Sequence, residues 1–424
     1  MLKPDNTFID KLLPGGLKLK TPANLDELKA VAAFNGSIHE SEAESLTYNL
    51  FASHPDTNGL DLCFLEDDHH KVLSSLCLIP WTLRYGEVFL QAGELGIVGT
   101  REDQRGKGLN RILMEYFWQR FNERNCLLSI IQGIPYFYRQ YGFEYSHIPL
   151  EGGWRIQADQ IPDITVSGYR LREAGRKDLP ELTKMFENQS RDLDISAVRR
   201  AEIWNYLLED LHEQDAMKHD TLLVLSPDGT PSSYFRLPHF HFYPNLLTID
   251  EISEANFEVC LVIFTELKRL AGLKGKEGIR LNLPKNSNLL QLSRDYGAAQ
   301  LGSYSWQVRV PDVLALLRKI APVLEERIAR SMFAGFTRPI GLDIYREIIE
   351  LEFINGRLKD VYSGSDLGNA ILHIPPQQLI PLILGGKTID QIGETFPDAS
   401  PDRTWKPLVN TLFPKTNAFF HTIY

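Results

Sequence analysis

Residues 95–113 read LGIVGTREDQRGKGLNRIL and carry the strongest structural signal in the chain. A strand, a short basic turn at 105–108 and a helix from about Leu109 are expected there. Such a turn presents unpaired backbone N–H groups at a helix N-terminus, where partial positive charge favours a phosphate. Gly106 and Gly108 let the main chain approach a pyrophosphate without a Cβ in the way. The segment therefore predicts a site for a phosphate-bearing cofactor.

Basic and apolar side chains around the turn support this interpretation. Three basic residues add positive charge where the phosphate would lie: Arg105, Lys107 and Arg111. Large apolar residues then recur with the i, i+3, i+4, i+7, i+8 spacing of a helix with one buried face. They are Leu109, Ile112, Leu113, Tyr116 and Phe117. We expect this helix to run from about residue 109 to 122.

Strands and helices alternate around that segment. Helical spacing covers residues 25–34, and strand-like runs cover 60–66, 72–81, 88–100 and 127–131. Charged or glycine-bearing turns separate these runs. The first third of the chain is therefore expected to have a mixed α/β structure.

A second motif follows the last of these strands, where residues 132–143 read QGIPYFYRQYGF. The two motifs together resemble the GCN5-related N-acetyltransferase (GNAT) family. Its pattern is Arg/Gln-x-x-Gly-x-Gly/Ala, followed about thirty residues later by a helix ending in Tyr-Gly-Phe. Here the first part stands as Arg105-x-x-Gly108-x-Asn110, with Asn110 in place of the usual small residue.

The continuation at 109–114 is similar to one branch of that family, the bacterial "enhanced intracellular survival" (Eis-type) proteins, which acetylate amines on aminoglycosides. The resemblance implies an N-terminal GNAT domain at 1–155 with an acetyl-CoA site, a degenerate second GNAT-like domain at 156–310, and a sterol-carrier-like domain at 311–424. The expected fold class is α+β. Each GNAT domain would be a mixed, mostly antiparallel sheet flanked by helices.

A repeated sequence pattern within the chain agrees with this domain arrangement. Residues 169–172, followed by 179–182, repeat the pattern of 17–20, followed by 25–28. This hints at a duplication. A glycine-bearing stretch at 151–168 is expected to be the linker between the two units.

The later parts of the chain give coarser expectations. In the second unit we expect strands at 221–225 and 279–283 and a helix at 256–273, with no glycine-rich loop between a strand and a helix. In the third we expect a helix at 313–330, strands at 341–355 and 357–361 joined by an Asn355-Gly356 hairpin, and a helix at 377–384. The apolar tail at 418–424 is expected to dock against the protein.

The resemblance also implies roles for single residues. Acetyl-CoA would be the cosubstrate, and no metal would be needed. Tyr138 matches the general acid of the family, and the free carboxylate of Tyr424 matches its general base. The implied cofactor-binding residues are Ile97, Val98 and Gly99 on the pantetheine arm, Arg105, Gly106, Lys107, Gly108, Leu109 and Asn110 on the pyrophosphate, and Gly133 and Ile134 over the cofactor.

These residue types suit acyl transfer from a thioester to a neutral amine. A thiol has a pKa near ~8.5 and a phenol near ~10, so Tyr138 would stay protonated and could donate to the departing sulfur. A terminal carboxylate is ionised and could draw a proton from the amine. Alternatives remain open from the residues alone. Tyr138 lies in an aromatic cluster that could serve packing, and Glu94 is a competing base whose side of the sheet depends on whether the strand has a bulge.

Histidines supply three further candidates. His239 and His241 alternate along a possible strand, but a metal site would need a third, suitably spaced ligand. His69 and His70 fall among acidic residues in an expected surface turn. His421, close to the chain end, could line an acceptor cleft.

Composition limits the function further. The net charge of −10 argues against a broad nucleic-acid surface, and the four separated cysteines, Cys63, Cys77, Cys126 and Cys260, read as buried free thiols. No signal peptide or membrane span is expected, so a cytoplasmic protein is predicted. The sequence thus predicts an acetyl-CoA-dependent N-acetyltransferase that acts on a primary amine of an aminoglycoside-like or polyamine-like small molecule, or on lysine. The alternative is a non-catalytic acyl-CoA sensor or lipid-binding protein. The resemblance also implies a homo-oligomer, with a hexamer as one form.

Overall fold

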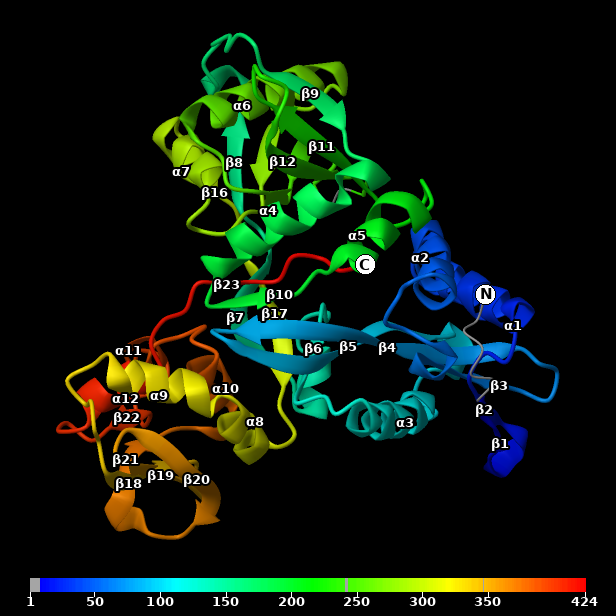
Figure 1. Ribbon diagram of the computed structural model, residues 1–424. Coiled ribbons are helices and arrows are strands. Elements are labelled where there is room, and N and C mark those ends of the chain that lie inside the picture. The colour runs from blue at the N-terminus through cyan, green and yellow to red at the C-terminus, as the bar shows by residue number, and fades with distance from the viewer. Residues whose placement is uncertain (1–7, 241–242, 346) are drawn as a thin grey trace.

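A computed structural model describes residues 8–240, 243–345 and 347–424, which form four sheets (Figure 1). The first sheet has ten strands and extends through the middle of the molecule. Two four-stranded sheets lie mainly in the part of the chain predicted at 156–310, called the second unit below. A five-stranded sheet lies in the part predicted at 311–424, called the third part. The layers of sheet and helix give a mixed α+β structure, as predicted.

The first sheet is mostly antiparallel. Its main path runs β1 (Asp10–Leu12), β2 (Lys18–Lys20), β3 (Leu62–Glu66), β4 (Val72–Tyr85), β5 (Val88–Thr100), β6 (Leu128–Ile131), β17 (Tyr304–Arg309) and β7 (Glu144–Glu151). β10 (Ile195–Ala197) pairs with β4 and also with β23 (Ala418–Phe419). Within the main path, β5 and β6 are parallel.

Side-chain alternation along β4 explains how both faces of this sheet are covered. Leu76 and Leu78 belong to the core under α3 (Leu109–Glu123), whereas Cys77 and Ile79 belong to the core shared with α1 (Leu25–Ile38). α2 (Ser41–Ala52) lies beside α1, and α3 lies across the sheet from both (Figure 1). Because successive strand residues point to opposite faces, one apolar strand supplies two cores. The helix predicted from the sequence at 109–122 is confirmed.

The second unit contains the predicted helix near 256–273 and strands at the predicted positions. One of its sheets runs β14 (Glu251–Ile252), β12 (Pro231–Pro238), β11 (His219–Leu225) and β9 (Arg170–Glu173); the other runs β13 (Leu246–Ile249), β15 (Gly278–Leu281), β8 (Trp154–Gln157) and β16 (Ala299–Gln300). Its helices are α4 (Leu179–Arg191), α5 (Ala201–Asn205), α6 (Phe257–Leu273) and α7 (Asn288–Asp295). As with β5 and β6, β13 and β15 are parallel.

Strands that the sequence assigned to one unit pair in another: β10, described above, and also β8 and β17. The linker predicted at 151–168 is wrong at β8, which pairs with β15 and β16. Gly153 makes this possible, since a Cβ there would lie 2.2 Å from the carbonyl oxygen of Leu281. β17 was expected in the second domain but lies in the first sheet, between β6 and β7. Sheet membership therefore cuts across the boundaries predicted at 155 and 310, and the domain division itself stays a prediction.

In the third part, one helix and one strand are each divided. The helix predicted at 313–330 is two helices, α8 (Val313–Lys319) and α9 (Ala321–Ala329), because Pro322 has no N–H for the continuing hydrogen bond. The strand predicted at 341–355 is β18 (Arg338–Asp343) and β19 (Ile348–Ile354). The predicted hairpin is confirmed, with φ of 50° at Asn355 and 76° at Gly356 between β19 and β20 (Arg357–Gly364). The remaining elements are β21 (Ala370–His373), α10 (Pro376–Ile383), α11 (Ile389–Gly393), β22 (Ser400–Pro401) and α12 (Lys406–Leu412).

Short helical turns connect these elements. They are η1 (Pro14–Gly16), η2 (Gly59–Asp61), η3 (Glu102–Gln104), η4 (Phe137–Tyr141), η5 (Ala158–Gln160), η6 (Arg176–Asp178) and η8 (Leu367–Asn369), with the π-helical turn η7 (Tyr206–Asp210). No helix in the three described ranges has both the length and the apolarity that crossing a membrane requires. The four cysteines are buried free thiols, as predicted.

The C-terminal tail leaves the third part and returns to the junction of the first sheet and the second unit (Figure 1). β23 pairs in parallel with β10 there. Tyr424 is only 3% exposed. The predicted docking of the tail is confirmed, and it brings the chain end to the first sheet.

Candidate functional site

The parallel strands β5 and β6 part beyond a short paired stretch. Ala92 through Glu94 pair with Leu128 through Ile130, after which β6 ends while β5 continues to Thr100. A bulge shapes the part of β5 that pairs with β4 on one side and no longer with β6 on the other. Cys77 pairs with Gly96 and Ser75 with Gly99, so two residues of β5 face one of β4. Ile97 adopts a left-handed φ of 46° at this bulge. The peptide groups of Ile97 and Val98 are thereby turned out of the regular ladder, where an extended ligand could pair with them.

The glycine turn lies at the start of α3, as the sequence predicts. Gly106 and Gly108 have φ of 78° and 79°, and a Cβ on either would meet no atom within 4 Å. Arg105 and Lys107 between and beside them are exposed. The helix begins at Leu109, so its first N–H groups have no partners within the helix. The turn is an open, positively charged cradle of backbone donors.

Asn110 connects this turn to the second motif. Its Nδ2 donates to the hydroxyl of Tyr141 at 3.1 Å, and its Oδ1 is buried without a partner among the described residues. The residue that departs from the family pattern thus makes a specific contact. Sequence reasoning did not anticipate it.

Gly133 and Tyr138 pack directly against each other. A Cβ on Gly133 would lie 2.5 Å from Cδ2 of Tyr138, so only glycine leaves room for this ring. Tyr138 is 7% exposed and belongs to the core under α3. Burial raises the pKa of Tyr138 well above its usual value, with a smaller contribution from Tyr141. The phenol is therefore protonated at neutral pH. Ile134, by contrast, is 62% exposed.

Glu94 is a buried carboxyl group on the opposite face of β5 from the α3 core. It is 2% exposed and accepts three hydrogen bonds: from the hydroxyl of Tyr424 at 2.8 Å, from Nε1 of Trp81 at 2.8 Å and from Nε2 of Gln132 at 3.2 Å. Burial raises the pKa of Glu94 to about 7, although the three hydrogen bonds oppose the rise. The group is thus poised to exchange a proton near neutrality.

The chain end reaches Glu94 through a side chain. Gln132 Nε2 also donates to the Tyr424 hydroxyl at 2.9 Å, which closes a triangle of Glu94, Gln132 and Tyr424. The terminal residue's backbone oxygen accepts from the Thr422 hydroxyl at 2.6 Å. The sequence led us to expect a role for the terminal carboxylate, and it gave no sign of the hydroxyl contact. A position beside Gly133 was the only signal that could have drawn attention to Gln132.

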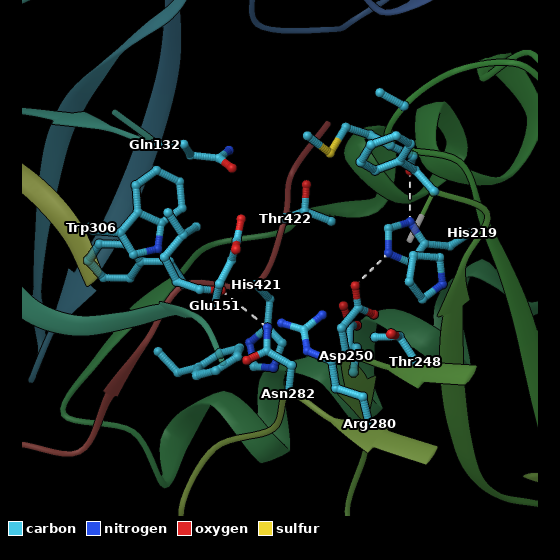
Figure 2. Close-up of a pocket in the computed structure, with 18 of the residues that line it drawn as sticks. Gln132, Glu151, His219, Thr248, Asp250, Arg280, Asn282, Trp306, His421 and Thr422 are labelled. Atoms are coloured by element: carbon cyan, nitrogen blue, oxygen red, sulfur yellow. Dashed lines mark hydrogen bonds and ion pairs between the residues drawn. The ribbon is translucent and has the colours of Figure 1, made fainter. Parts of the chain in front are cut away.

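A cavity of about 210 Å³ lies between the first sheet, the second unit and the tail. Figure 2 shows Gln132 and Trp306 on one side and His219, Thr248 and Asp250 on the other. Gln132 therefore both lines this cavity and donates a hydrogen bond to Glu94. The polar lining residues are Gln132, Glu151, His219, Thr248, Asp250, Glu251, Arg280, Asn282, His421 and Thr422; the aromatic ones are Trp81, Phe240, Trp306, Phe419 and Phe420.

The histidine candidates have different surroundings. His421, which the sequence offered as a residue that could line an acceptor cleft, lines this cavity and is buried, which lowers its pKa to about 4. His239 contacts Asp220 at 2.7 Å, while His241 lies outside the described residues. His69 is exposed, and His70 contacts Glu66 at 3.1 Å. Across the described parts of the chain, no three His, Cys, Asp or Glu residues are arranged to hold a metal ion.

Comparison with known proteins agrees with this geometry. Residues 27–146 match the family model described as "Acetyltransferase (GNAT) domain". No curated protein matches the chain. Among solved structures, a probable N-acyltransferase of unknown function from Enterococcus faecalis has a TM-score of 0.70 at 14% identity, covering 96% of this chain and 100% of that one.

Two further structures are similar over nearly their full lengths. A GCN5-related N-acetyltransferase from Anabaena variabilis has a TM-score of 0.67 at 16% identity, covering 95% of this chain and 99% of that one. Eis1 from Mycobacterium abscessus has a TM-score of 0.63 at 15% identity, covering 96% and 100%. Residues 27–146 thus match a GNAT domain model, and the chain as a whole has the fold of these solved structures.

Proposed function

We propose that the protein is an acetyl-CoA-dependent N-acetyltransferase that transfers an acetyl group to a primary amine. One observation carries the proposal. Where β5 and β6 separate, a glycine turn suited to phosphates follows β5. The buried carboxyl group of Glu94 lies at the last residue pair between the two strands. The match of residues 27–146 to the GNAT domain model supports the proposal independently.

The proposed cofactor site extends along the edge of β5 that no longer pairs with β6, and continues to the glycine turn at 105–108. The backbone of Ile97, Val98 and Gly99 would pair with the pantetheine arm. The segment from Arg105 to Asn110, including Gly106, Lys107, Gly108 and Leu109, would hold the pyrophosphate on backbone N–H groups at the start of α3. Gly133 and the exposed Ile134 would cover the thioester end.

The proposed reaction needs one proton acceptor and one proton donor. The amine nitrogen attacks the thioester carbonyl carbon, the C–S bond breaks, and the amine proton passes to a base. Tyr138 donates its proton to the leaving sulfur, so the products are the acetamide and free CoA thiol. The buried phenol is protonated and therefore able to act as this acid.

Two carboxylates are candidates for the base. Glu94 has a pKa of about 7 and reaches the cavity through Gln132. The terminal carboxylate of Tyr424 is the base implied by the family resemblance, and it lies beside Thr422, which lines the cavity. The geometry favours Glu94 as base, with the Tyr424 hydroxyl as a positioning group that holds it.

The proposal for the rest of the chain rests on the order of its elements and on the family resemblance. The second unit repeats the order strand, helix, strands, helix and parallel strand, which supports a duplicated GNAT-like domain. For the third part, the family resemblance suggests a sterol-carrier-like domain. An aminoglycoside-like or polyamine-like molecule or a lysine side chain as acceptor, a homo-oligomeric state and a cytoplasmic location likewise remain proposals.

A test of the function separates binding from turnover. Calorimetry with acetyl-CoA should show saturable binding, and thiol release should depend on an added primary amine. Binding without amine-dependent release would contradict the enzyme and favour the acyl-CoA sensor. Absence of binding to acetyl-CoA and to longer acyl-CoAs would contradict both.

Replacing Gly108 by Ala is expected to weaken acetyl-CoA binding about 5- to 30-fold. A left-handed φ of 79° costs an L-residue about 1–2 kcal/mol, so the alanine turn leaves this conformation in the free protein and cofactor binding must restore it; the new methyl group also occupies space beside the phosphates. The dissociation constant from calorimetry measures the effect. Gly302→Ala is the matched control, because Gly302 has open space and no left-handed φ. Equal affinities for the two variants would remove Gly108 from the cofactor site.

Replacing Tyr424 by Phe is expected to move the acid limb of kcat/KM to higher pH. The Tyr424 hydroxyl bond lowers the pKa of Glu94, so its loss raises that pKa above about 7, and the ionised base is then reached only at higher pH. The pH profile measures the shift. Tyr362→Phe, which removes a similar tyrosine bond to Glu350 in the third part, is the control. An unmoved acid limb would show that the hydroxyl does not act through Glu94.

A further inference from the structure

The second-unit wall of the cavity contains two polar side chains that lack partners. Thr248 on β13 and Arg280 on β15 are register partners on neighbouring parallel strands. They are 1% and 4% exposed, and both line the cavity. The Thr248 hydroxyl and Nη2 of Arg280 form no hydrogen bond with any described residue. A buried hydroxyl and a buried guanidinium nitrogen without partners are costly unless a ligand satisfies them.

Arg280 is fixed in direction but not neutralised. Its Nε donates to the carbonyl oxygen of Gly152 at 2.8 Å, and its guanidinium stacks on the ring of Tyr243 at 4.8 Å. No carboxylate within the described ranges lies within ion-pair distance of it. Arginine stays charged in proteins, and its planar fork suits a carboxylate.

The other charges around Arg280 are largely accounted for. His219 contacts Asp250 Oδ2 at 2.8 Å and the carbonyl oxygen of Met217 at 2.7 Å, so both imidazole nitrogens face acceptors. Glu251 is paired with Arg199 at 2.6 Å. The remaining carboxyl group that lines the cavity is Glu151. Burial raises the pKa of Glu151, and the charge of Arg280 only partly opposes this.

Asp250 adds an acceptor to these donors. The pKa of Asp250 is lowered: burial raises it, but the neighbouring His219 and Arg236 together more than offset burial, so the carboxylate is ionised. Its second oxygen, Oδ1, is buried and has no partner. Thr248 on β13 and Asp250, the residue after the end of β13, both line the cavity. The wall thus offers two donors for an anion and one anionic acceptor for a cation.

We propose that this wall binds the head of an α-amino acid, with its carboxylate on Arg280 and Thr248 and its α-ammonium on Asp250. Figure 2 places these three residues across the cavity from Gln132, which contacts Glu94. The amine that reacts is then the distal one, so the acceptor is a free diamino acid of the lysine or ornithine type. That last step rests on the proposed acetyl transfer; the binding of the head group does not.

Three ligands of matched length test the head-group site directly. Lysine has both head groups, 1,5-diaminopentane lacks the carboxylate, and 6-aminohexanoate lacks the α-amine. Calorimetry on the full chain should show lysine binding at least about tenfold more tightly than either analogue, the loss expected when a charge-assisted hydrogen bond is removed. Equal affinity for lysine and both analogues, or no binding of lysine, would overturn the proposal.

Substitutions identify the residues responsible. Arg280→Gln should abolish the preference for lysine over 1,5-diaminopentane, and Asp250→Asn the preference over 6-aminohexanoate. Thr248→Val changes one hydroxyl to a methyl group and keeps the strand, so it should lower lysine affinity about three- to tenfold even if the arginine variant folds poorly. Arg170→Gln, exposed on β9, is the control. A lysine preference that survives in Thr248→Val and Arg280→Gln would overturn the assignment.

Turnover distinguishes this proposal from the general function. Lysine-selective binding without amine-dependent thiol release would contradict acetyl transfer and leave the head-group site standing. Equal kcat/KM for lysine and 1,5-diaminopentane would contradict the diamino-acid acceptor and leave acetyl transfer standing.

Discussion

Replacing Glu94 by Gln is expected to lower kcat by about 10²- to 10⁴-fold, the usual contribution of a positioned base. The neutral amide cannot take the amine proton, and it is close to the carboxyl group in size. Because burial raises the pKa of Glu94 to about 7, the wild-type kcat/KM should rise with pH through that value. The variant should lose this inflection, whereas its acetyl-CoA affinity from calorimetry should be unchanged.

Two comparisons make the result specific to Glu94. Glu350→Gln alters another buried carboxyl group, in the third part, and should leave both the rate and the pH profile as they are. Appending one glycine after Tyr424 moves the terminal carboxylate but keeps the tyrosine side chain. Full activity of Glu94→Gln together with an inactive extended chain would transfer the role of base to the chain end.

Replacing Tyr138 by Phe is expected to lower kcat and kcat/KM together by about 10²- to 10⁴-fold. Only the hydroxyl is removed, so the ring still packs against Gly133 and the fold is preserved. A group that acts on the leaving sulfur contributes in the transition state and not in cofactor binding. The dissociation constant for acetyl-CoA should therefore stay within about twofold of wild type by calorimetry.

The matched control for this variant is Tyr169→Phe, which removes a surface hydroxyl bonded to Glu258 in the second unit. It should retain wild-type kcat. If Tyr138→Phe also retained wild-type kcat, Tyr138 would be a packing residue of the aromatic cluster formed with Phe137, Tyr141 and Phe143.

Local sequence patterns predicted several elements well. The spacing of apolar residues from Leu109 onward depends only on helical periodicity, and α3 begins at that residue. The Asn355-Gly356 hairpin also formed as expected, since its left-handed φ values are a property of those two residue types. Pro322 was present in the sequence, but its effect in dividing α8 from α9 was overlooked.

Long-range pairing was not predictable in the same way. β17 inserts between β6 and β7, although more than a hundred residues separate it from either strand. The sequence of an apolar strand does not specify which strand it pairs with, because backbone hydrogen bonds are the same for every partner. β8 was not predicted because the two glycines directly before it, Gly152 and Gly153, are typical of a linker.

For the site, the sequence by itself determined the cradle: glycines that accept left-handed φ, basic neighbours and a helix N-terminus are all encoded within a few residues. Only the tertiary structure decided which side chains from distant parts of the chain complete the site. The register of β5 with β4 fixed the face on which Glu94 lies, the tail brought the Tyr424 hydroxyl to it, and the second unit set Thr248, Asp250 and Arg280 on one wall. A pKa of about 7 for Glu94 arises from burial beneath distant segments, and burial is a property of the assembled molecule rather than of any stretch of its chain.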